Sequence, residues 1–130
     1  WNQQLAQREL REKFPTYVLA PQSDHLWDAD HLAQIKAIIA NLPYVNPDRI
    51  YMLGHSMGGH GTNILIQLDP NYFAAIAPSA GTGRTDDEDF IEATIIKDVP
   101  TWAFHGDQDT AGPTNRKRPF SKRCRNSAAT

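Results

Sequence analysis

The sequence has very little cysteine and no long apolar segment. Cys124 is its single cysteine, which excludes an internal disulfide framework and a cysteine-rich zinc site. No apolar run approaches the ~18 residues of a membrane-spanning helix. The sequence shows no basic segment followed by an apolar stretch, which is the pattern that indicates a signal peptide. With 130 residues and 40% hydrophobic residues, the chain is instead typical of one globular domain.

The sequence also lacks a strong net charge, but its charges are unevenly placed. The formal net charge is −2. Residues 116–130 hold six of the thirteen basic side chains and no acid, whereas the other 115 residues hold seven basic and fifteen acidic side chains. The acidic body argues against nucleic-acid binding. We expect a folded core over residues 1–112 and a basic, poorly ordered tail over 113–130. The start at Trp1 and the abrupt change of composition at Pro113 suggest a truncated or frame-shifted chain.

Apolar runs and helical patterns alternate along the chain. The runs lie at 17–20, 50–53, 74–77 and 101–104, and none alternates polar with apolar residues, which is typical of strands buried on both faces. Helices are expected at 1–13, 30–42, about 58–68 and 89–97. We therefore predict an α/β fold with a mainly parallel sheet of about four strands, flanked by helices.

The residues after the second run carry the chemistry. Gly54-His55-Ser56-Met57-Gly58 stands between a predicted strand and a predicted helix. Such a sharp turn lifts the central serine above the sheet edge, and Gly54 and Gly58 would avoid collisions there. Ser56 is therefore the candidate nucleophile, and the Met57 N–H is a candidate oxyanion donor. The alternative is a glycine-rich turn with an incidental serine.

Four segments together resemble a known family. They are residues 17–22 (Tyr-Val-Leu-Ala-Pro-Gln), 48–51, 54–62 and 99–109. Over about residues 14–112 the chain resembles α/β-hydrolases, most closely the branch of carboxylesterases, feruloyl-esterase-like proteins and predicted peptidases, near the dienelactone hydrolases. The resemblance implies a serine hydrolase that cleaves small carboxylic esters without a metal or organic cofactor. It also implies that Asp109, in the His-Gly-x-x-Asp pattern, is the triad acid.

The general base is missing from its expected place. In this fold the chain order is serine, acid, histidine, yet no histidine follows Asp109. His105 is a tentative surrogate base, and His25 follows the first predicted strand near the catalytic edge. The remaining histidines are expected to be non-catalytic: His31, His55 and His60.

The resemblance also predicts an upstream strand and a loop that carries a second oxyanion donor. Neither is recognisable in the sequence. We therefore expect reduced activity. The alternatives are an inactive hydrolase-fold fragment, a binding module, or a hydrolase completed by a partner chain. A gap in the sheet would leave exposed strand edges, so a homo-oligomer is expected.

Overall fold

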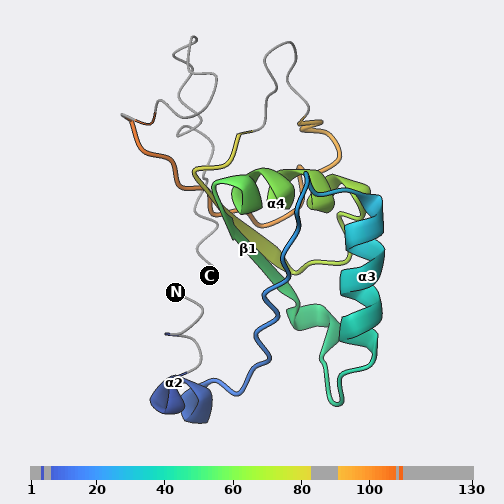
Figure 1. Ribbon diagram of the computed structural model, residues 1–130, viewed down its shortest axis with the longest axis vertical. Coiled ribbons are helices and arrows are strands. Elements are labelled where there is room, and N and C mark those ends of the chain that lie inside the picture. Colours follow the sequence, from blue (N-terminus) through green and yellow to red (C-terminus); the bar gives the residue numbers. More distant parts are fainter. Residues whose placement is uncertain (1–3, 5–6, 83–90, 108, 110–130) are drawn as a thin grey trace.

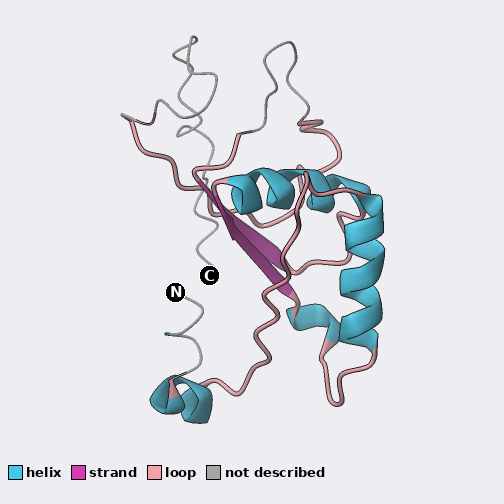
Figure 2. Cartoon of the chain, in the orientation of Figure 1, coloured by secondary structure: helices cyan, strands magenta, loops and turns pink. Residues whose placement is uncertain are grey.

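The computed structural model describes residues 4, 7–82, 91–107 and 109 (Figure 1). The expected tail at 113–130 lies outside these residues. The elements in chain order are α2 (Arg8–Lys13), α3 (Ala29–Ala40), a 3₁₀ turn (Pro47–Arg49), β1 (Tyr51–His55), α4 (Met57–Leu68) and β2 (Ala75–Ser79). Strands β1 and β2 are parallel, with helices against them, so the predicted α/β class is confirmed (Figure 2).

The described part of the sheet has two strands and one extended neighbour rather than four strands. Tyr51 pairs with Ala75, and the register runs to His55 opposite Ser79. Residues 101–104 run beside β2, where only two isolated bridges join them to it. The physical reason is Pro78, whose carbonyl accepts from the Phe104 N–H but which has no N–H of its own to donate. One hydrogen bond of the ladder is therefore missing between Ile76 and Ser79.

Two further expectations were wrong. Residues 17–20 are extended but form no strand, and their side chains are largely exposed. An apolar run cannot become a strand without a backbone to pair with, and none lies along it in the part that the structure describes. Residues 91–97 form turns, with the Ile95 N–H donating to the Glu92 carbonyl, rather than the end of a helix.

The core lies between the helices and one face of the sheet. Helix α4 contacts both strands, and α3 contacts α4. Among the described residues, six buried hydrophobic side chains form this core: Leu32, Ile35, Leu65, Ile66, Phe73 and Ile76. Ile38 of α3 and Leu68 of α4 are apolar but exposed. The other face of β1 carries the exposed Tyr51 and Leu53, so the prediction of strands buried on both faces does not hold for β1 within the described residues.

Helix α3 begins at a well-formed cap. The Asp28 carboxylate accepts from the His31 backbone N–H at 3.1 Å, and the Asp28 backbone N–H faces the His31 ring at 3.3 Å. This reciprocal arrangement satisfies donors that a helix start leaves unpaired. Among the described helices, none combines the length and the hydropathy needed to cross a bilayer.

Candidate active site

The candidate site is built around a strained serine. Ser56 stands alone between the end of β1 and the start of α4, with φ 54° and ψ −117°. Positive φ is costly for a side chain with a Cβ, at about 1–3 kcal/mol, and persists only where the surroundings enforce it. Here the Ser56 N–H donates to the Ser79 carbonyl at 2.9 Å, and the Ser56 carbonyl accepts from the His60 N–H at 2.9 Å. Two bonds from opposite sides thus hold the turn.

Glycines let α4 come very close to the strand ends. A Cβ on Gly54 would lie 2.0 Å from the Gly58 carbonyl oxygen, and one on Gly81 would lie 2.3 Å from the carbonyl carbon of Gly59. A Cβ on Gly58 would meet nothing within 4 Å, so the expected collision at that position was wrong. The close approach depends on Gly54, Gly59 and Gly81, of which sequence analysis had named only the first.

The start of α4 offers free backbone donors beside Ser56. The first N–H groups of a helix have no carbonyl partner within it. The Met57 N–H is the first of these, and the Met57 residue is about half exposed. An oxygen bearing negative charge next to Ser56 Oγ would meet this donor and the positive end of the helix dipole.

The histidines near the turn have other surroundings. The His55 ring nitrogen Nδ1 lies 3.3 Å from Ser79 Oγ, so this ring is turned to the neighbouring strand. His60 lies one turn into α4, where burial lowers its pKa and the Thr82 backbone opposes that shift. The Ser56 side chain itself makes no hydrogen bond to any described residue.

The predicted acid and the surrogate base contact each other. His105 Nε2 lies 3.6 Å from an Asp109 carboxylate oxygen, and the Asp109 N–H donates to the Gly106 carbonyl to close the turn between them. The Asp109 side chain is 23% exposed and that of His105 is 45% exposed. The less exposed Asp109 carboxylate is therefore able to orient the more exposed His105 ring.

Strands β1 and β2 and residues 101–104 run parallel, so their carboxyl ends lie at the same edge of the sheet. His55 pairs with Ser79, and Ser79 bridges to Phe104, so Ser56 and His105 follow at the same edge with Ala80 between them. Neighbouring strands are about 4.8 Å apart, which puts roughly 10 Å between the Ser56 and His105 chain positions. Ala80 has φ 48°, a second strained turn that sequence analysis did not find.

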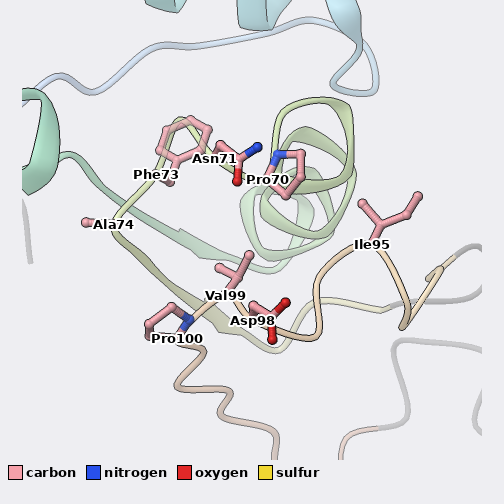
Figure 3. A pocket seen from close by; sticks show the side chains of 8 residues that line it. All are labelled: Pro70, Asn71, Phe73, Ala74, Ile95, Asp98, Val99 and Pro100. Carbon is pink, nitrogen blue, oxygen red and sulfur yellow. The ribbon is translucent and has the colours of Figure 1, made fainter.

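A hollow of about 290 Å³ lies at the opposite edge (Figure 3). Its lining comes from the segments that lead into β2 and into residues 101–104, including Phe73, Ala74, Val99 and Pro100. Those segments precede the strands, whereas Ser56 follows one. The hollow is therefore separate from the candidate active site.

Comparisons with known proteins agree with this geometry. The model of the prolyl oligopeptidase family matches residues 28–111. A solved structure described as a thermostable esterase matches with a TM-score of 0.70 and 33% identity over 84% of this chain. The match covers 32% of the esterase, so the chain spans about a third of that protein's length. A search of curated proteins finds no match. Because the family model covers well over half of the chain, we conclude that the chain belongs to the prolyl oligopeptidase family, which is part of the α/β-hydrolase superfamily of serine hydrolases.

Proposed function

We propose that the chain carries the nucleophile of a serine hydrolase that cleaves carboxylic esters, and that Ser56 is that nucleophile. The observation that carries this proposal is the strained Ser56 turn between β1 and α4, next to unpaired helix donors. The solved relative described as an esterase supports an ester substrate. The family name favours a second candidate substrate, a peptide.

The reaction follows from the positions of these groups. Ser56 Oγ attacks the ester carbonyl carbon and gives its proton to a base, while the Met57 N–H stabilises the carbonyl oxygen as it becomes negative. Collapse of this intermediate expels the alcohol, which takes up the proton. Water then attacks the acyl-serine in the same way and releases the acid. Neither a metal nor an organic cofactor takes part in these steps.

His105 is the proposed surrogate base, and Asp109 is the proposed acid that orients it. Their contact at 3.6 Å and their place on the Ser56 edge support these roles. Because roughly 10 Å separates the chain positions of Ser56 and His105, both side chains must lean across Ala80 to share a proton. We therefore expect slow turnover of activated esters, far below the ~10 s⁻¹ of an ordinary enzyme.

A fluorophosphonate probe tests the nucleophile directly. Wild-type protein should be labelled at Ser56 in stoichiometric amounts, and Ser56→Ala should not be labelled. Hydrolysis of p-nitrophenyl acetate should be lost in Ser56→Ala and in His105→Ala, while the matched control His55→Ala keeps it. Labelling that persists in Ser56→Ala would remove Ser56 from the mechanism.

The same assay separates the alternatives. An inactive fragment or binding module would give no labelling at any protein concentration. A site completed by a partner chain would give specific activity that rises with protein concentration. Faster cleavage of peptide p-nitroanilides than of aryl esters would favour the peptidase candidate over the esterase.

A further inference from the structure

A second cluster of reactive side chains, which shares no residue with the Ser56 site, lies at the start of α3. It consists of His25, Asp28 and His31, and one donor atom from each lies within 4.8 Å of the others. His25 Nε2 is 3.6 Å from one Asp28 carboxylate oxygen, and His31 Nδ1 is 2.7 Å from the other. The spacing of three residues between the members brings two imidazoles to one carboxylate.

The far side of each ring is already occupied. His25 Nδ1 lies 2.6 Å from an Asp24 carboxylate oxygen, and His31 Nε2 lies 2.8 Å from Ser23 Oγ. Such contacts hold each ring by its outer nitrogen and leave the inner nitrogen facing Asp28. His25 Nε2 and His31 Nδ1 therefore both face the Asp28 carboxylate, where a ring proton or a metal ion can bridge nitrogen and oxygen.

We propose that His25, Asp28 and His31 bind one divalent transition-metal ion of the zinc class. Two imidazoles and one carboxylate are donors that zinc prefers, whereas calcium and magnesium prefer oxygen alone. Zinc–ligand bonds of about 2.0–2.2 Å place tetrahedral donors roughly 3.4 Å apart, close to the 3.6 Å between His25 and Asp28. The His25 side chain is 62% exposed, so its ring and its Asp24 partner can shift together by the small amount that the ion requires.

The surroundings indicate a structural role. The cluster joins the 23–28 loop to the first turn of α3, and Trp27 packs against the His31 ring at 5.1 Å. A Cβ on Gly61 would lie 2.2 Å from the Trp27 ring, so the same loop is pressed against α4. An ion at this place would hold the loop, α3 and α4 together and would stabilise the fold by binding only the folded state.

The test is zinc binding by the full 130-residue chain. After chelator treatment, calorimetric titration measures the zinc affinity and stoichiometry, and thermal unfolding measures the effect of zinc on Tm. We expect one zinc ion per chain and a rise in Tm with zinc. His25→Ala and Asp28→Asn should each weaken zinc binding by at least about tenfold, and Asp24→Ala by about 10–100-fold as an outer-contact effect. Asp28→Asn is chosen because asparagine also caps helices well, so α3 is kept.

Matched controls make the result decisive. Asp30→Asn changes an exposed acid on the same turn, and Cys124→Ser removes the only thiol; both should bind zinc like wild type. Ring nitrogen NMR should show that zinc shifts His25 Nε2 and His31 Nδ1. Zinc affinity that is unchanged in both His25→Ala and Asp28→Asn, or that is lost in Cys124→Ser, would overturn the proposal.

Discussion

Ser56, the proposed nucleophile, has a backbone conformation that costs stability. Its φ of 54° and ψ of −117° suit glycine far better than serine. The cost of this conformation is about 1–3 kcal/mol, and the hydrogen bonds to Ser79 and His60 enforce it. A residue that keeps its hydroxyl in such a place is a strong candidate for chemistry.

This cost can be measured with two variants that both lack the hydroxyl. Ser56→Gly should be more stable than Ser56→Ala by about 1 kcal/mol, because relief of the strain exceeds the extra freedom of glycine in the unfolded chain. Urea unfolding of the two variants gives the difference. Equal midpoints would mean that the strain is no larger than the cost of glycine's extra freedom in the unfolded chain, about 0.4–1 kcal/mol.

Gly54 and Gly58 belong to the same motif but should respond in opposite ways. Gly54→Ala would place a Cβ 2.0 Å from a backbone oxygen, which cannot move without moving α4, so we expect a loss of at least about 2 kcal/mol. Gly58→Ala meets open space in a helix and should be neutral or stabilising by up to about 1 kcal/mol. Denaturant midpoints check both, and a large loss in Gly58→Ala would contradict the packing described here.

At the scale of the elements, an ion pair ties α3 to the end of α4. Lys36 Nζ donates to the Asp69 carboxylate and also lies 4.6 Å from the centre of the Tyr72 ring. The hydrogen bond from Lys36 lowers the pKa of Asp69 below its usual value. Both side chains are about one third exposed, so the pair contributes about 1 kcal/mol or less.

The lowered pKa predicts how this contribution depends on pH. The folded state binds a proton at Asp69 less readily than the unfolded state does. The stabilisation is therefore complete above the unfolded pKa of about 3.9 and is lost as the pH falls through the folded value. Asp69→Asn should lower the free energy of unfolding at pH 7. At about pH 2, where the wild-type carboxylate is protonated, the variant and the wild type should be about equally stable. Urea unfolding across this range is the measurement, and a constant difference between the two proteins would exclude the effect.

Local signals in the sequence were enough for α3, α4 and the Ser56 turn. Asp28, a residue type common at helix starts, caps α3. The predicted strand, turn and helix around Ser56 are all found, within one or two residues at each end. Non-local pairing was harder to predict. Residues 17–20 have the composition of a strand, but no backbone segment of the described chain pairs with them. Pro78 of β2 lacks the N–H that would complete the pairing with residues 101–104. The cluster of His25, Asp28 and His31 was not predicted: the residues are three apart, but His25 and Asp28 precede the helix, so helical spacing alone does not bring them together.

At the scale of the whole molecule, β1 has one unpaired edge. Its backbone bonds to β2, and within the described residues nothing pairs with its other side. Tyr51 and Leu53 also expose apolar side chains on the uncovered face. Unpaired edges of this kind recruit other strands.

We therefore expect the chain to self-associate through β1. Light scattering over a range of concentrations should show mass rising above 14.6 kDa. Leu53→Lys should shift the equilibrium toward monomer, because a charge on an edge strand opposes pairing. Thr94→Lys, an exposed change in a turn, is the matched control and should associate like wild type. A monomer at every concentration would contradict this expectation.

The packing of α4 also sets a pattern of amide hydrogen exchange. Its interior amides are bonded within a helix that both strands and α3 cover, so they exchange only when most of the molecule opens. Helix α2 buries no residue and should exchange quickly. Between the protected amides of β1 and those of α4 stand the first donors of the helix, beginning at Met57, which have no acceptor within it. The groups proposed to receive the oxyanion should therefore exchange as a short, fast island within the slowest part of the chain.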